Sequence, residues 1–204
     1  MKWGLRFASS AFILHHPPAS APRESPTPMV LVSATSWDDS SGRMTSLSAM
    51  LAEKGFTCVQ TDLKISDCSM NDAQAIMKSF ESELSSMIRL AAIPFPPVII
   101  ARGAACVVAQ TYISSHPASG MILLSPPASN AELVESCKLP TPLTEFNFEP
   151  NFPIAIIGSP AEVKHLRKNN RICQSQNVDI ISVEDMDESQ IFFEIDLWLD
   201  KCGM

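Results

Sequence analysis

The sequence predicts a doubly wound α/β domain, in which helices cover both faces of a mostly parallel sheet. Short apolar runs, typical of buried strands, alternate with stretches whose apolar residues repeat every three or four positions, as on one face of a helix. This alternation favours parallel pairing through helical crossovers. Hydrophobic residues make up 46% of the 204 residues, which is sufficient for the core of one domain.

The first predicted strand follows a proline-rich linker. Five prolines lie in residues 17–28, where neither a helix nor a central strand can persist, so we expect the domain to occupy residues 29–204. The apolar run Met29–Val32 opens it, and a polar loop from Asp38 to Ser41 follows. Later strands are predicted at residues 57–63, 98–101, 121–124, 154–157 and 178–183.

Helices are expected between these strands. An apolar stripe over residues 44–56 predicts the first, and Gly55 suits its C-terminal end because glycine accepts a left-handed conformation. The most regular stripe covers residues 73–91. Residues 125–153 are too few for a cap domain, so a three-layer sandwich without a cap is expected. Further helices are predicted at residues 104–114, 161–175 and 191–202.

Residues 1–28 are predicted to form a separate N-terminal extension. Residues 1–23 contain three basic and no acidic residues, so their net charge is +3, while the rest of the chain carries −10 of the total of −7. Basic, serine and apolar residues mixed in this way are typical of a mitochondrial transit peptide. Two alternatives stay open, namely a secretory signal cleaved after Ala19-Ser20-Ala21 and an untargeted, disordered extension on a cytoplasmic protein.

Composition argues against several classes of partner and cofactor. An acidic chain is unsuited to general nucleic-acid binding, and no apolar run approaches the roughly 20 residues of a transmembrane helix. The six cysteines form no C-x-x-C pair and none lies at ligand spacing from a histidine, so no metal site is expected. The seven glycines cannot form G-x-G-x-x-G or a P-loop, so no nucleotide cofactor is expected either.

Several segments, in their order and spacing, resemble parts of the α/β-hydrolase family. The resemblance spans about residues 29–202, and it implies that family's fold with a site at the strand ends. One departure is that residues 62–69 lack both glycines of the usual D-x-R-G-x-G-x-S continuation. The matching segments are a first helix and second strand at 51–64, the nucleophile elbow at 98–110, the next strand at 121–127 and the acid-bearing strand at 153–158.

The resemblance implies a catalytic serine at the centre of a G-x-S-x-G elbow, and here that position is Gly103, flanked by Arg102 and Ala104. A glycine has no side chain with which to attack a carbonyl, although it suits the strained backbone of the turn. We therefore expect the turn to persist without its nucleophile.

The other catalytic parts are altered as well. The family's histidine lies in the loop after the last strand, here residues 184–190, which contain none; the four histidines are at positions 15, 16, 116 and 165. The family's acid matches Ala161, with Glu162 adjacent, and the oxyanion loop at residues 33–37 lacks the usual H-G. Because all four parts depart from the pattern, the sequence predicts no triad chemistry.

Other reactive residues have simpler interpretations. Cys106, one turn into the elbow helix, is the candidate for a relocated nucleophile, since a helix N-terminus stabilises a thiolate, but a buried packing residue explains it better. Ser125 and Ser159 end strands on the ligand-binding side without a histidine partner. One predicted helix face, either solvated or in contact with an acidic partner, RNA or a lipid headgroup, carries Lys164, Arg167, Lys168 and Arg171.

The sequence thus predicts a catalytically inactive α/β-hydrolase-like protein that acts in mitochondria as a binding or scaffold subunit with protein partners. Two alternatives from other classes remain. One is an esterase or thioesterase with a relocated nucleophile. The other is a small-molecule sensor that retains the acyl pocket and binds a small acyl ligand beside Gly103.

Overall fold

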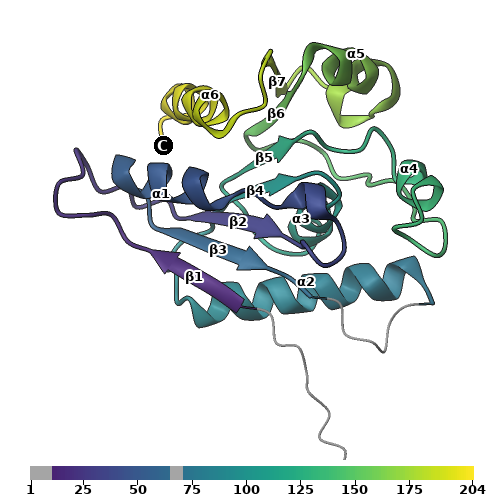
Figure 1. Ribbon diagram of the computed structural model, residues 1–204, viewed down its shortest axis with the longest axis horizontal. Helices are drawn as coiled ribbons and strands as arrows, with labels where there is room; N and C mark the ends of the chain where they lie inside the picture. The colour runs from purple at the N-terminus through teal and green to yellow at the C-terminus, as the bar shows by residue number, and fades with distance from the viewer. Residues whose placement is uncertain (1–10, 65–70) are drawn as a thin grey trace, which may run out of the picture.

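The computed structural model describes residues 11–64 and 71–204 and shows a seven-stranded sheet between helices (Figure 1). The strand order is β1-β3-β2-β4-β5-β6-β7, and every neighbouring pair is parallel except β1 and β3. The doubly wound, mostly parallel sheet predicted from the sequence is confirmed. The strands are β1 Ala11–His15, β2 Met29–Ser33, β3 Cys58–Asp62, β4 Val98–Arg102, β5 Gly120–Leu124, β6 Ile154–Gly158 and β7 Val178–Ser182.

Two apolar cores lie on the two faces of this sheet. Alternate residues of β2 contribute to each: Val30 and Val32 pack with the core of α2 and α3, whereas Met29 and Leu31 pack with that of α1 and α6. All five residues of β2 are buried, which agrees with the apolar run of its first four residues. The helices are α1 Thr45–Lys54, α2 Ala73–Leu90, α3 Ala105–Ile113, α4 Ala131–Glu135, α5 Pro160–Asn169 and α6 Glu188–Lys201, with short 3₁₀ helices η1 Asp39–Ser41 and η3 Ile172–Gln174.

The N-terminal segment differs from the sequence prediction, which placed the first strand at Met29. Residues Ala11–His15 form the edge strand β1, antiparallel to β3. Phe12 and Leu14 pack against the core while Ile13 is 54% exposed, so the strand buries one face only. Because Phe12, Ile13 and Leu14 are all apolar, the alternation of inward and exposed residues is not visible in the sequence. Residues 1–10, including part of the proposed transit peptide, and residues 65–70, part of the D-x-R-G-x-G-x-S comparison, lie outside the described residues.

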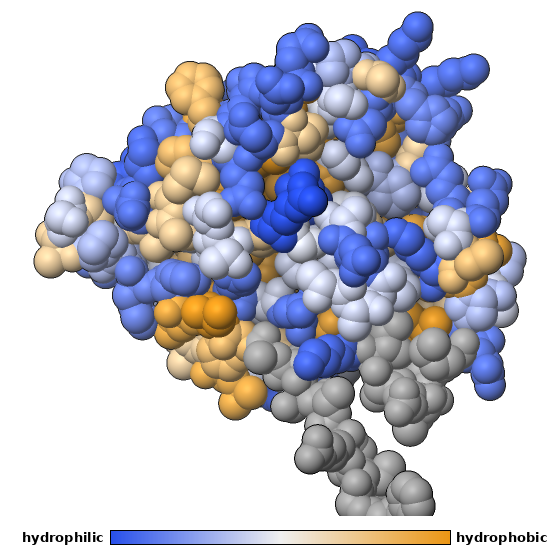
Figure 2. All heavy atoms as spheres, viewed as in Figure 1, coloured by the Kyte–Doolittle hydropathy of each residue, from blue (hydrophilic) through white to orange (hydrophobic). Residues whose placement is uncertain are grey.

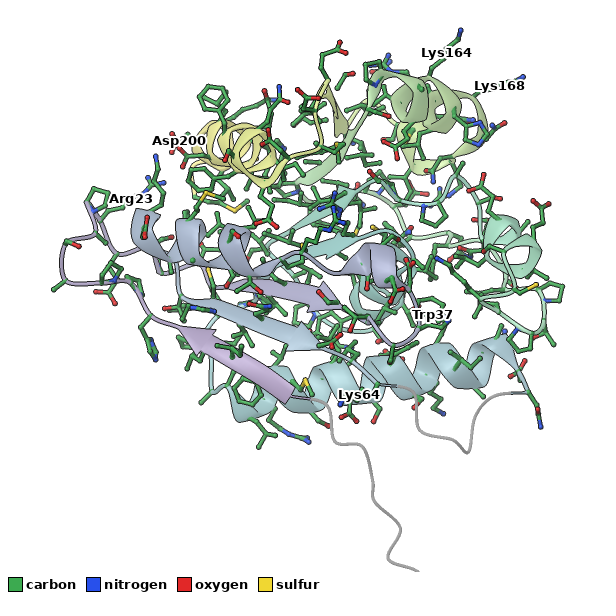
Figure 3. All side chains as sticks on the ribbon, viewed as in Figure 1. Arg23, Trp37, Lys64, Lys164, Lys168 and Asp200 are labelled. Carbon is green, nitrogen blue, oxygen red and sulfur yellow. The ribbon has the colours of Figure 1, made fainter. Side chains whose placement is uncertain are left out.

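The linker after β1 returns along α1 and is held at two points. Gly55 ends α1 with φ 111°, as predicted, and its carbonyl accepts a 2.8 Å hydrogen bond from the Ser25 amide. A Cβ at Gly55 would collide with the backbone carbonyl of Arg23, so a glycine is required for this close approach. The guanidinium of Arg23 lies 3.2 Å from a carboxylate oxygen of Asp200 on α6, and Figure 3 shows the two side by side.

No cap domain lies between β5 and β6. Residues 125–153 hold the five-residue helix α4 and an irregular segment that runs beside α5. Arg171 fixes this segment, because its guanidinium donates to the carbonyls of Phe146 and Phe148 at 2.9 and 2.5 Å. Arg171 is therefore not part of an open basic face, whereas Lys164 and Lys168 project away from the molecule in Figure 3.

Candidate active-site cavity

A cavity of about 530 Å³ opens at the carboxyl end of the parallel strands. After β2 the chain continues to β3 on one side, and β4 then pairs on the other side of β2, so the order of the strands reverses here. Ligands of open α/β sheets bind at such a point. The lining comes from the loops that follow five successive strands of the sheet: Ser40 and Arg43 after β2, Gly103 after β4, Ser125 after β5, Glu162 after β6 and Met186 after β7.

A tight turn joins β4 to α3 at Arg102, Gly103 and Ala104, where the resemblance places the elbow. Strand β4 ends at Arg102, Gly103 adopts φ 59°, and α3 begins directly after Ala104. The Gly103 amide donates a 2.9 Å hydrogen bond to the Leu124 carbonyl, which fixes the turn to β5. Ala104 and Ala105 are buried and small, so α3 packs closely on the sheet. The geometry of a nucleophile turn is thus retained around a residue with no side chain.

A buried carboxylate occupies the space in front of this turn. Asp38 Oδ2 accepts hydrogen bonds from the Ala104 amide and from the Ser40 hydroxyl, both at 2.7 Å. Its Oδ1 lies 2.5 Å from Nζ of Lys138. Burial raises the pKa of Asp38, but the hydrogen bonds from Lys138, Ser40 and Ala104 outweigh it, so the pKa lies below its ordinary value. Asp38 is therefore a charged group at neutral pH.

This carboxylate takes the position that an oxyanion would need. In the elbow of a serine hydrolase, the amide after the nucleophile is one of the donors to the oxyanion. The equivalent amide here belongs to Ala104, and it is already bonded to Asp38. A Cβ added at Gly103 would collide with Ser40 Oγ and lie 2.7 Å from Asp38 Oδ2. There is consequently no free space for a nucleophilic side chain in this arrangement.

The loop that carries Asp38 is tied to its neighbours. The Asp62 carboxylate at the end of β3 accepts from the Thr35 amide and hydroxyl at 2.8 and 2.7 Å. Ser41 Oγ accepts from the Ala34 amide at 2.9 Å and donates to the Asp38 carbonyl. Trp37, which Figure 3 shows above α2, donates to the Lys138 carbonyl at 2.8 Å. These bonds hold the carboxylate of Asp38 against the elbow.

Glu162 is brought into the cavity, although the position matched to the family's acid is Ala161. Glu162 Oε2 accepts from the amide and hydroxyl of Ser159 at 2.7 and 2.8 Å, which completes the capping box of α5. It also accepts from the Ser125 hydroxyl at 3.3 Å. Ser125 and Ser159, singled out in the sequence, thus act as partners of one carboxylate, and Ser159 is the N-cap of α5.

None of the four histidines lines the cavity. His15 is in β1 and His16 follows it, whereas His116 lies beyond the end of α3, stacked on Tyr112 with ring centroids 4.4 Å apart. His165 projects from α5 and is 3.0 Å from Glu132. His116 Nδ1 is 2.9 Å from the Ser115 hydroxyl, but this pair lies outside the cavity lining.

In the loop after β7, where the family has its histidine, Met186 lines the cavity instead. Its carbonyl accepts a 3.4 Å hydrogen bond from the guanidinium of Arg102. The predicted loop thus reaches the elbow, but it brings a thioether and a carbonyl rather than an imidazole.

Cys106 is a core residue rather than a cavity residue. Its side chain is fully buried, and its thiol donates to the carbonyls of Ala101 at 3.3 Å and Leu124 at 3.7 Å. Burial raises its pKa, so a thiolate is disfavoured. Within residues 11–64 and 71–204, no three His, Cys, Asp or Glu side chains gather as metal ligands. None of the helices in the described part of the chain is long and apolar enough to cross a membrane.

Two functional features of this cavity were missed in the sequence. The sequence predicts a polar loop at Asp38, but the ion-pair partner Lys138 is 100 residues away, and no local pattern links the two residues. Arg43 has a φ of 60°, and nothing in the local sequence indicates this backbone conformation. The one local signal is the capping of η1, in which Asp38 accepts from the Ser40 amide.

Comparison with solved structures finds esterases of the same architecture. An esterase from Thermogutta terrifontis with malate bound gives a TM-score of 0.68 at 11% identity, covering 96% of this chain and 94% of that chain. Est1E from Butyrivibrio proteoclasticus gives 0.61 at 9% identity, covering 95% and 94%. The esterase domain of a Rhodothermus marinus protein gives 0.59 at 12% identity, covering 95% and 99%. No family model and no curated protein matches the sequence.

The protein therefore has an α/β-hydrolase-like fold, as the resemblance of its segments predicted. Within that fold it is a form in which the elbow carries Gly103 and the adjacent amide is bonded to Asp38.

Proposed function

We propose that this α/β-hydrolase-like protein is catalytically inactive and acts by binding. The observation that carries the proposal is the 2.7 Å hydrogen bond from the Ala104 amide to the Asp38 carboxylate. In an acyl-transfer reaction this amide stabilises a developing negative charge, and loss of one such donor costs roughly 3 kcal/mol of the barrier. Here a permanent negative charge occupies the donor and would repel a second one.

The missing nucleophile and base support the same conclusion. Gly103 offers no hydroxyl, and the cavity is lined by Met186 where the family has its histidine. The Glu162 carboxylate is engaged by the helix cap, and the imidazole of His165, further along α5, lies 3.0 Å from Glu132 instead. Each of these changes removes a separate requirement of triad catalysis.

The esterase alternative would require a relocated nucleophile, and Ser125 is the residue to test. Its hydroxyl donates to Glu162 at 3.3 Å inside the cavity, so a carboxylate is available to accept its proton. Cys106 is excluded from contact with a substrate by its complete burial.

The proposal is tested by hydrolysis of p-nitrophenyl acetate, p-nitrophenyl butyrate and an acyl-thioester by the full chain. We expect rates equal to those of a buffer blank and of the Ser125→Ala and Cys106→Ala variants. Turnover that disappears in Ser125→Ala would show that the catalytic group has moved and would overturn the proposal.

The remaining part of the proposal is the setting. A binding or scaffold role in mitochondria is supported by the basic N-terminus on an otherwise acidic chain. Residues 1–28 fused to a fluorescent protein should direct it to mitochondria, with Lys2→Glu/Arg6→Glu as the control that should not. Cytoplasmic fluorescence from the unmodified fusion would contradict this setting. Affinity purification of the tagged full chain from mitochondria should then recover protein partners that a tagged matrix control does not.

The sensor alternative is favoured by one observation, the persistence of a cavity beside Gly103. Its lining differs from the apolar acyl pocket expected from the resemblance. Arginine, serine and carboxylate side chains line it, with Met186 as an apolar member. A ligand of this cavity is thus expected to be polar.

A further inference from the structure

Two guanidinium groups line the cavity beside Gly103 without carboxylate partners. Arg102 ends β4, is half-buried and donates only to the Met186 carbonyl, at 3.4 Å, among the described residues. Arg43, which follows η1, forms no hydrogen bond or ion pair with any residue that the structure describes. The carboxylates of Asp39 and Glu162 line the same cavity, and an anion placed between the two guanidinium groups would be attracted to both of them.

Among the described residues, the nearby carboxylates are not ion-paired with either arginine. Asp38 is paired with Lys138 and the elbow amide, and Glu162 accepts three hydrogen bonds from Ser159 and Ser125. Asp39 is exposed at the start of η1 and is not ion-paired with either arginine. The guanidinium groups are therefore available to a ligand.

The backbone around the cavity supplies an independent observation. Of the four non-glycine residues with positive φ in the described chain, two line this cavity: Arg43 at 60° and Ser125 at 46°. Gly103, at 59°, is a third residue of the lining in this conformation. Such conformations cost about 1–3 kcal/mol each for residues with a side chain, and they cluster at ligand sites, where they orient side chains.

We propose that this cavity binds a small anionic molecule through carboxylate or phosphate oxygens held between Arg43 and Arg102. A guanidinium matches both oxyanions with two parallel hydrogen bonds, and the Ser125 hydroxyl lines the same cavity. The volume of about 530 Å³ lies within the usual range for small-molecule sites. This inference rests on the binding role proposed above and gives it a chemical class of ligand.

Titration calorimetry of the full chain tests the proposal, at low ionic strength, with inorganic phosphate and succinate as probes and neutral succinamide as the control. We expect at least one anion to bind, with Arg43→Gln and Arg102→Gln each raising its Kd about tenfold or more. Arg89→Gln is the matched control, because Arg89 is an exposed arginine on α2, which does not line the cavity. Arg43 has no native bond to lose, so its variant should keep the wild-type Tm.

The outcomes separate the ligand classes. Binding of phosphate alone assigns a phosphate ligand, and binding of succinate alone assigns a carboxylate. Absence of heat with both anions at millimolar concentration overturns the proposal, as does equal binding of succinamide or equal weakening by Arg89→Gln. None of these results bears on ester hydrolysis, so the absence of catalysis stands or falls by its own assay.

Discussion

Asp38→Asn tests whether the buried carboxylate supports the fold in front of the elbow. Removal of one partner of a buried ion pair costs about 3–5 kcal/mol, because the other charge is left uncompensated. The Asp38 side chain is 4% exposed, but that of Lys138 is 28% exposed, so water solvates part of the charge that remains. Asparagine keeps an acceptor for the Ala104 amide. We therefore expect the free energy of unfolding to fall by about 2–3 kcal/mol at pH 7.

The dependence of this loss on pH provides the sharper test. The folded-state pKa of Asp38 lies below its ordinary value of 3.8, so its charge contributes stability above that value, and the contribution is lost as pH falls through the folded pKa. Urea unfolding of both proteins should show a difference in unfolding free energy that is steady from pH 7 to pH 5 and shrinks as pH falls below 3.8. Asp39→Asn, one residue away and exposed, should stay within about 0.5 kcal/mol of wild type. A difference that is absent at pH 7 or constant with pH would refute the reasoning.

Three further substitutions test the two glycine turns and the burial of one face of β1. Gly103→Ser should give no ester turnover. It should also lower the unfolding free energy by about 2–4 kcal/mol, because φ is 59° and the new Cβ displaces Asp38. Turnover or unchanged stability would contradict this expectation. Gly55→Ala should cost about 3 kcal/mol or more in urea unfolding because its Cβ collides with the Arg23 carbonyl, whereas exposed Glu53→Ala should be neutral. Phe12→Ser should lower Tm while Ile13→Ser does not, and equal effects would argue against the register of β1.

Much of the fold was predictable because burial on both faces leaves a local signature. Strands β2, β4, β5 and β6 are short apolar runs, and α2 has one apolar face over its whole length. Strand β1 was missed because an edge strand needs only two inward residues, Phe12 and Leu14, and such a pattern is too short to separate from a targeting segment. The basic charge and the prolines of the N-terminal segment favour a targeting extension. No local pattern encodes the pairing of β1 with β3.

The candidate site was predictable in its backbone and not in its side-chain contacts. The elbow at Gly103 follows from a strand, a glycine and small residues in sequence order. The bond between Asp38 and Ala104 joins residues that are 66 positions apart in the chain. Arg43 and Arg102 line the same cavity only because of the order of the strands in the sheet. Contacts of this kind depend on tertiary structure, so the sequence indicated which positions depart from the family's pattern but not what the residues at those positions contact.

These contacts show how bonds within the protein stabilise the turn at Gly103. A working oxyanion site keeps polar donors unpaired by protein until the substrate arrives, and such donors are a cost to stability. Here the Ala104 amide is paired with Asp38, and Glu162, one residue from the acid position, completes a helix cap. Groups that an enzyme would hold ready for a reaction are thus bonded within the protein. Arg43 forms no hydrogen bond or ion pair among the described residues, and Arg102 donates only to the Met186 carbonyl at 3.4 Å, which is why an anion is the ligand expected between them.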